Sequence, residues 1–298
     1  MRYTLRQLEV FLTIARCGNL TQAASQLAMS QSAASSALKD LENQFDLQLF
    51  DRIGRRLQLN EQGKALQPKA QSLLEQAGEI ERMLLNHDDA GHLAIGATLS
   101  IGNYLAVGLV AQYKSRYPQA DVRLEVNNTH NIVEQIRRFE LDVGLIEGEI
   151  NDSELDIQTW RTDELVVFCS PEHPLANQAS LSDEQLVKAQ WILRESGSGT
   201  RQAFDRAMHG LLPELNVAME LQHTEAIKRA VEAVLGLGCL SRITLEDAFR
   251  HGRLIPLAVP HRDFHRSLYR VLHKQKYRST GLESWLSLCD EMANPLKK

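Results

Sequence analysis

The chain has few of the residues and segments that mark a secreted, membrane or metal-binding protein. Only four of its 298 residues are cysteine, and Cys17, Cys169, Cys239 and Cys289 form no C-x-x-C pair. A disulfide framework or a structural zinc site is therefore not expected, and buried cysteines are favoured over a redox sensor. No apolar run follows a basic start, and none is long enough to span a bilayer. These absences predict a cytoplasmic protein that does not contact a membrane.

Motifs of catalysis and nucleotide binding are missing too. The sequence contains no G-x-x-x-x-G-K-[ST] loop, no G-x-S-x-G elbow and no H-E-x-x-H pair. We therefore expect no catalytic residues, no metal and no cofactor. Turnover of a bound ligand would favour an enzyme instead.

Positive charge is scarce, and its distribution is informative. The net charge is −5, yet residues 1–60 hold seven Lys and Arg against five Asp and Glu. The N-terminal segment is thus the positive part of an acidic chain. A charge this modest predicts weak binding of a polyanion by one such segment alone and stronger binding by a pair of segments.

Two short helices are predicted in this segment, at residues 19–27 and 30–42. In the second, Ala34, Ala37, Leu38, Leu41 and Phe45 recur at helical spacing and are expected to face inward. The opposite face carries only short or polar side chains: Gln31, Ser32, Ser35, Ser36 and Lys39. A face of this kind fits the major groove of DNA, although an ordinary solvated helix surface is the alternative. The pattern favours a helix-turn-helix.

A β-hairpin is predicted next, around Gly54. Arg52, Arg55 and Arg56 lie near its tip, where they can neutralise DNA phosphates. A long helix should follow from Asn60 to about Asn86, bent locally at Pro68. Its apolar residues are spaced four and three apart, as in paired helices: Leu66, Ala70, Leu73, Ala77, Ile80 and Leu84. This spacing favours dimerisation over a helix packed only on its own domain.

From His92 onward, strands and helices alternate. Strands are expected at 92–97, 122–126 and 141–146, with helices at 100–117 and 129–139, an order that requires a parallel sheet. A second set of strands is expected at 165–168, 191–193, 217–221 and 238–240. A return strand at 268–272 and a closing helix at 282–292 complete a body of two lobes.

Ligand contacts are expected where strands end and helices begin. Ten residues meet this description: Thr98, Ser100, Asn128, Glu147, Ser196, Ser198, Gly199, Thr200, Arg201 and Glu225. The run from Arg194 to Arg201 is the sharpest signal, because its glycines let a ligand approach the backbone and its hydroxyls can donate. The alternatives are plain helix caps, a simple turn, and pairing of Arg194 or Arg201 with Glu195 or Glu225. Because these groups are expected to converge on a single cleft, the pattern favours a small anion as the ligand.

Several motifs of the N-terminal segment together resemble the LysR-type transcriptional regulators of bacteria. They are Leu5-Arg6-Gln7-Leu8-Glu9-Val10-Phe11, Thr21-Gln22-Ala23-Ala24, Ser30-Gln31-Ser32-Ala33, Leu41-Glu42, Leu49-Phe50-Asp51-Arg52 and Leu59-Asn60-Glu61-Gln62-Gly63. Asp46 departs from the usual Gly, but Asp is among the few other residues that tolerate left-handed backbone. Ala34 departs from a larger aliphatic residue, so packing beneath the second helix is expected to be looser. The body matches more loosely and resembles the family's effector-binding domain, which shares its architecture with periplasmic solute-binding proteins. A transporter's solute-binding protein is thus a third candidate, disfavoured by the N-terminal segment and the lack of a signal peptide.

The resemblance implies an α + α/β architecture in three parts. Residues 1–60 would form a winged helix-turn-helix domain, 61–90 a linker helix and hinge, and 91–298 the effector-binding domain. Lobe I would span about 91–161 and 266–298, and lobe II about 162–265. The DNA-binding residues implied are Thr21, Gln22, Ser30, Gln31, Ser32, Ser35, Ser36, Lys39, Arg52, Arg55 and Arg56.

The resemblance also implies partners. Double-stranded DNA with an interrupted inverted repeat, RNA polymerase and further copies of the chain are expected. The copies would form a dimer or a dimer of dimers, a homotetramer. The effector would be a small acid or oxyanion, and the branch that the chain resembles includes regulators of sulfur and other oxyanion metabolism, which sense small oxyanions such as sulfur oxyanions.

Overall fold

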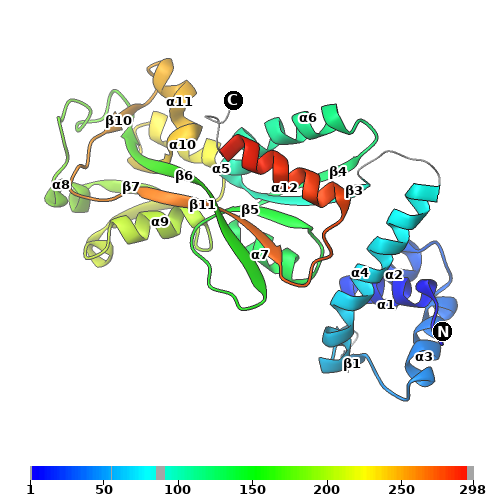
Figure 1. Cartoon of the computed structure of the whole chain (residues 1–298). Coiled ribbons are helices and arrows are strands. Elements are labelled where there is room, and N and C mark those ends of the chain that lie inside the picture. Colours follow the sequence, from blue (N-terminus) through cyan, green and yellow to red (C-terminus); the bar gives the residue numbers. More distant parts are fainter. Residues whose placement is uncertain (1, 55, 85–90, 294–298) are drawn as a thin grey trace.

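The computed structural model describes residues 2–54, 56–84 and 91–293. Figure 1 shows a small N-terminal head and a long helix at one end, beside a larger body. The body is built on a nine-stranded sheet, and a two-stranded sheet belongs to the head. Among the described residues, no helix combines the length and apolar character that crossing a membrane requires.

The head consists of three helices and one hairpin: α1 (Leu5–Cys17), α2 (Leu20–Gln26), α3 (Gln31–Gln44), β1 (Phe50–Ile53) and β2 (Arg56–Leu59). Polar side chains start the helices, because Asn19 accepts the N–H of Thr21 at 2.8 Å and Ser30 accepts that of Ala33 at 3.1 Å. The predicted helix-turn-helix is confirmed. The expectation for Phe45 is wrong: α3 ends there, and its side chain is 45% exposed.

The long helix α4 (Glu61–Leu84) starts at Asn60, as predicted, because Asn60 Oδ1 accepts the N–H of Gly63 at 2.9 Å. It continues through Pro68. The expected helix end at Asn86 lies outside the described residues. Leu66, Leu73 and the buried Ala70 pack against the core of the head, so α4 and the head form one body.

One end of the large sheet is parallel, as predicted: β3 (His92–Thr98) lies between β4 (Asp121–Asn127) and β5 (Val143–Glu147). Its helices are α5 (Leu99–Ile101), η1 (Gly102–Ala106), α6 (Val107–Arg116), α7 (Thr129–Arg137) and α12 (Thr280–Ala293). The predicted helix 100–117 contains a π-helical turn, η1, which periodicity did not indicate. We call this unit lobe I.

The other end of the sheet, which we call lobe II, has parallel pairing of β7 with β8 and β9. Its strands are β7 (Gln190–Arg194), β8 (Asn216–Leu221), β9 (Leu237–Ser241) and β10 (Ile255–Leu257). Its helices are α8 (Asp183–Lys188), α9 (Gly199–Ala207), η2 (Leu212–Glu214), α10 (Thr224–Glu232) and α11 (Arg242–Arg250). Each lobe has separate hydrophobic clusters on the two faces of its part of the sheet.

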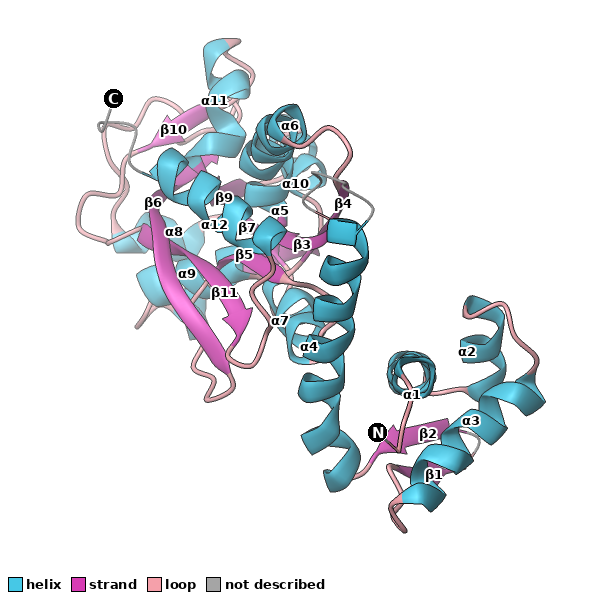
Figure 2. Ribbon diagram, turned by 45° about the vertical axis from the view of Figure 1, so that its right-hand side comes forward, coloured by secondary structure: helices cyan, strands magenta, loops and turns pink. Residues whose placement is uncertain are grey.

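Two long antiparallel strands join the lobes, β6 (Leu155–Cys169) and β11 (His265–His273), as Figure 2 shows. The strand order is β4-β3-β5-β11-β6-β9-β7-β8, with β10 paired to β6. The predicted return strand at 268–272 is therefore confirmed, and it lies next to β5. The first half of β6 was missed, because half-buried and exposed residues dominate it.

Candidate functional site

The outer face of α3 is open. Gln31, Ser32, Ser36 and Lys39 are exposed and Ser35 is partly exposed, whereas Ala34, Leu38 and Leu41 on the opposite face are buried. The Oγ atoms of Ser30 and Ser32 lie 3.0 Å apart at the start of the helix. The surface rich in serine is thus not packed against protein, and it can enter a groove.

The flanking residues are open as well. Thr21 and Gln22 are exposed in the first turn of α2. Arg52 and Arg56 lie exposed on β1 and β2, opposite Leu57 and Ile53 in the hairpin register. Arg55 lies outside the described residues. Around α3, a helix start and two guanidinium groups are therefore available to phosphates.

The apolar stripe of α4 divides into two parts. Its first three residues pack on the head, Ala77 is partly exposed, and Ile80 and Leu84 are 55% and 74% exposed. An apolar groove of about 490 Å³ lies between the head and the first half of α4. Its walls include Tyr3, Leu41, Leu47, Leu66 and Leu73. One copy of the chain thus exposes apolar side chains at one end of α4 and a groove at the other.

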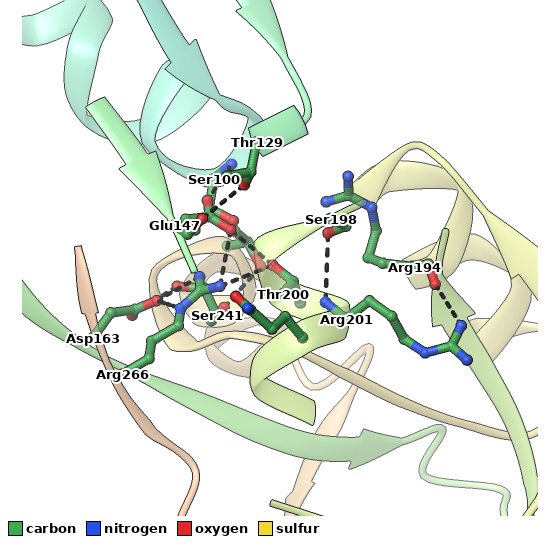
Figure 3. A network of polar contacts seen from close by, with 12 residues as sticks. Ser100, Thr129, Glu147, Asp163, Arg194, Ser198, Thr200, Arg201, Ser241 and Arg266 are labelled. Atoms are coloured by element: carbon green, nitrogen blue, oxygen red, sulfur yellow. Dashed lines mark hydrogen bonds and ion pairs between the residues drawn. The ribbon is translucent and has the colours of Figure 1, made fainter. Parts of the chain in front are cut away.

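The centre of the body holds a buried polar network around Glu147, at the end of β5 (Figure 3). Its carboxylate accepts the N–H of Ser100 at 3.1 Å, the hydroxyl of Thr200 at 2.8 Å and Nη1 of Arg266 at 2.9 Å. Arg266 Nε also donates to Asp163 at 2.7 Å. The network joins lobe I through Ser100 and lobe II through Thr200.

The charges in this network stabilise one another. Burial favours the neutral form of Glu147, but the Arg266 guanidinium and the donors Ser100 and Thr200 outweigh it, so the pKa of Glu147 is lowered. Direct effector contact was expected for Glu147, yet its carboxylate is already satisfied. Arg266 and Asp163 were not predicted, because both lie on the crossing strands, away from any strand-to-helix turn.

Two predicted residues are helix caps. Asn128 Oδ1 accepts the N–H of Asn131 at 3.0 Å at the start of α7, and Ser198 Oγ accepts that of Arg201 at 3.5 Å at the start of α9. Gly199 is required by space, since a Cβ there would lie 2.1 Å from the carbonyl oxygen of Glu147.

The two arginines of the predicted loop form ion pairs within lobe II. Arg194 pairs with Glu195 at 2.8 Å, one of the expected alternatives. Arg201 pairs with Asp205 at 2.9 Å and with Glu220 at 2.8 Å. Both guanidinium groups therefore already have carboxylate partners within lobe II.

A cavity of about 480 Å³ opens between α7 and α9. Four predicted residues line it: Ser196, Ser198, Gly199 and Arg201. This volume is typical of pockets for small ligands. Ion-paired residues, such as Arg137 with Asp152, form part of its wall.

A second contact between the lobes lies at Tyr104. Its hydroxyl accepts from Lys228 Nζ at 3.3 Å and donates to Glu225 at 3.2 Å, and Lys228 pairs with Glu225 at 2.5 Å. Lys228 is 8% exposed, and burial disfavours its charge, but Glu225 and Tyr104 outweigh burial and raise its pKa. Glu225 was predicted; Tyr104 and Lys228 were not, because neither lies in a strand-to-helix turn.

Within the described part of the chain, two buried hydroxyl groups lack hydrogen-bond partners. Among the described residues, neither Thr98 Oγ1 nor Thr224 Oγ1 has a hydrogen-bond partner, although the residues are only 2% and 3% exposed. Thr98 ends β3, and Thr224 begins α10, where no side chain caps the helix. Buried hydroxyls normally find partners, so these two are available to a ligand.

The cysteines and metal-ligating residues add no further site. Cys169, Cys239 and Cys289 are buried, and burial raises the thiol pKa of Cys169 to about 11 and of Cys289 to about 12. In the part of the chain that the structure describes, no group of three or more His, Cys, Asp or Glu could hold a metal ion.

Known protein families match both parts of the chain. A family model described as "Bacterial regulatory helix-turn-helix protein, lysR family" matches residues 5–64, and one described as "LysR substrate binding domain" matches residues 86–294. An Escherichia coli protein named "Uncharacterized HTH-type transcriptional regulator YeiE" is 46% identical over 290 residues, which cover 97% of this chain and 98% of that protein.

Solved structures share the fold. A full-length OxyR variant from Pseudomonas aeruginosa aligns with a TM-score of 0.73 at 22% identity, covering 99% of this chain and 95% of that chain. The regulatory domain of CcmR from Synechocystis, in complex with 2-PG, aligns with a TM-score of 0.64 at 26% identity. That alignment covers 69% of this chain and 99% of that chain.

Proposed function

The chain belongs to the LysR family of transcriptional regulators, and from this premise we propose that a small anion bound between the lobes controls its binding to an inverted-repeat operator. The observation that carries the proposal is the combination of an open polar face on α3 with unpartnered hydroxyls buried in the body. The first suits duplex DNA, and the second suits a small polar ligand.

In this proposal Gln31, Ser32, Ser35 and Lys39 read the major groove. Thr21, Ser30 and Arg52 bind phosphates on either side of the groove. The other members of the predicted DNA-binding set are proposed to lie close to the DNA: Gln22, Ser36, Arg55 and Arg56. The small size of the serine side chains supports close approach of α3 to base edges. Exposure of Arg52 and Arg56 supports their role as phosphate ligands.

The effector is proposed to be a compact oxyanion or carboxylate. Thr98 and Thr224 supply hydroxyl donors, and Lys228 supplies an ammonium group that stays charged because Glu225 and Tyr104 outweigh the cost of its burial. The 2-PG complex of the CcmR domain supports an anion in a body of this fold. Glu147 then organises Ser100 and Thr200 without touching the ligand. A sulfur oxyanion fits the same chemistry.

Self-association is proposed to pair two heads on one operator. The exposed Ile80 and Leu84 of one copy have the apolar character and length to cover the groove beside Leu66 and Leu73 of another. Val217 and Met219 on the edge strand β8, at 41% and 38% exposure, offer a further surface for a dimer of dimers. We also propose a cytoplasmic location and contact with RNA polymerase, because promoter DNA is the partner.

DNA binding is tested by selecting duplexes from a random pool with the full chain and measuring retardation of the selected sequence in a gel. Lys39→Ala should weaken binding by about 1–3 kcal/mol. Lys64→Ala is the control, since Lys64 is exposed on α4 and pairs with Glu61. Failure to enrich any sequence, or equal losses in the two variants, would contradict the proposal.

Effector binding is tested by thermal unfolding with a panel of oxyanions and carboxylates. A ligand at about 100 times its Kd stabilises by about 2.7 kcal/mol. Replacing Ser198, which lies at the cavity and outside the Glu147 network, should blunt this response and leave DNA binding intact. Stabilisation by cations alone would oppose an anionic effector.

A further inference from the structure

A polar stripe on α4 faces lobe I. Gln67, Gln71, Glu75 and Glu79 are spaced four apart and therefore share one side of the helix. Gln67 Nε2 donates to the carbonyl oxygen of Arg138 at 3.2 Å, and Gln71 Nε2 donates to Glu75 at 2.7 Å. This stripe differs from the apolar stripe on the same helix, so docking on lobe I leaves that stripe available.

The strongest contact of the stripe is a buried ion triad. Lys276 lies in the loop between β11 and α12 and pairs with Glu75 of α4 and, at 2.6 Å, with Asp142 of lobe I. Its side chain is 3% exposed, and those of Glu75 and Asp142 are 21% and 16% exposed. Burial opposes the charge of Lys276, but the two carboxylates outweigh it and raise its pKa.

Glu79 makes a second contact between α4 and the segment that follows β11. Glu79 accepts the hydroxyl of Tyr277 at 2.6 Å and the backbone N–H of Thr280 at 3.0 Å. Thr280 is the first residue of α12, so a carboxylate from α4 lies at the positive end of that helix.

The triad and the Glu147 network lie at opposite ends of the same two strands. Asp142 immediately precedes β5, and Glu147 ends it. Arg266 lies at the start of β11, and Lys276 follows its end. The strands are antiparallel neighbours, with Leu268 opposite Glu147 and Val271 opposite Gly144. The Glu147–Arg266 pair therefore connects β5 and β11 at one end of their ladder, between the lobes. The Asp142–Lys276 pair connects the same two strands at the other end, next to α4.

We propose that the Glu75–Lys276–Asp142 triad is a joint that ties α4 to lobe I, and that the β5–β11 ladder couples this joint to the Glu147–Arg266 pair. Because α4 packs on the head, movement of the joint moves the head. Glu75 Oε2 is buried without a hydrogen-bond partner among the described residues, so the carboxylate is held in the joint through Oε1. The regulatory meaning rests on the proposed function, but the joint can be measured without DNA or effector.

Hydrogen exchange of the full chain tests the joint. Glu75→Gln leaves Lys276 paired with Asp142 and removes only the charge from α4. Exchange should accelerate about tenfold in α4 and in residues 274–282, as expected for loss of a hydrogen bond to a charged group. Glu81→Gln, on the exposed side of the same helix, should behave like the wild type. Tyr277→Phe is a second, milder variant and should accelerate exchange in the same segments.

The coupling between the two ends of the β5–β11 ladder is tested by Thr200→Val. This change removes a hydroxyl from the Glu147 network, at the end of the ladder that lies away from α4. Exchange in α4 and in residues 274–282 should change at least about threefold, which exceeds the error of additivity for independent sites. Unchanged exchange there, with altered exchange around Glu147, would overturn the coupling. Equal exchange in the wild type, Glu75→Gln and Tyr277→Phe would overturn the joint. Neither result depends on whether the chain binds DNA.

Discussion

Arg266 and Glu147 form an ion pair at the centre of the body, with 2.9 Å between Nη1 and Oε2 and with both side chains 2% exposed. Arg266 reaches it from a crossing strand and Glu147 from lobe I. Thr200 of lobe II donates to the carboxylate and accepts from the guanidinium at 3.0 Å. Any rotation of the lobes must therefore preserve or rearrange this pair, so the effector proposed to bind between them would act on it.

Removing Arg266 should be costly. Arg266→Met leaves Glu147 and Asp163 buried without their cation, and breaking a buried pair costs about 3–5 kcal/mol. Arg242→Met removes an exposed pair with Glu164 and should cost about 0–1 kcal/mol. Urea unfolding of the two variants measures the difference. Equal losses would mean that the central pair contributes no more than a surface one.

Acid should weaken the same network. The pKa of Glu147 is lowered in the folded chain, so its contribution to stability is present above the pKa of the unfolded chain, about 4.3, and is lost as pH falls toward the folded value. The free energy of unfolding should therefore decline below about pH 4.3. In Glu147→Gln, stability at pH 7 should be lower and the decline shallower. Parallel pH curves for the two proteins would contradict this assignment.

Local features of the fold were predictable from single residues. Asn19, Ser30 and Asn60 start helices because their side chains accept the N–H groups of the first turn. Asp46 was expected to tolerate left-handed backbone, and its φ is +51°. Such effects act over a few residues, so the sequence pattern contains them.

Partnerships across the chain were not predictable. Glu147 was placed correctly at a strand end, but its partner Arg266 lies 119 positions away on another strand. Likewise, the polar spacing of Gln67, Gln71, Glu75 and Glu79 indicates a shared face of α4 without naming lobe I as its neighbour. Periodicity tells which side of an element is apolar or polar, whereas contact partners depend on topology.

Self-association through α4 should depend on its exposed end. Replacing both Ile80 and Leu84 with Lys removes apolar surface worth about 1.5–3 kcal/mol per side chain when buried. The dimer should therefore dissociate at least about tenfold more readily in sedimentation equilibrium. Glu81→Lys, on the same turn of helix, controls for added positive charge. If the double variant sediments like the wild type, another surface forms the dimer.

Thr98 offers a way to separate ligand binding from folding. Its buried hydroxyl lacks a partner among the described residues, so Thr98→Val should stabilise the ligand-free chain by about 1 kcal/mol. The same change should reduce the stabilisation by a bound anion, because the valine cannot donate. Thr200→Val is the matched comparison and should destabilise the ligand-free chain, since the Thr200 hydroxyl donates to Glu147 at 2.8 Å. Thermal unfolding of both variants, with and without the stabilising anion, measures these effects. A destabilised Thr98→Val with an intact response would show that this hydroxyl serves folding, and the ligand would then have to be held by the residues around Ser196 and Ser198.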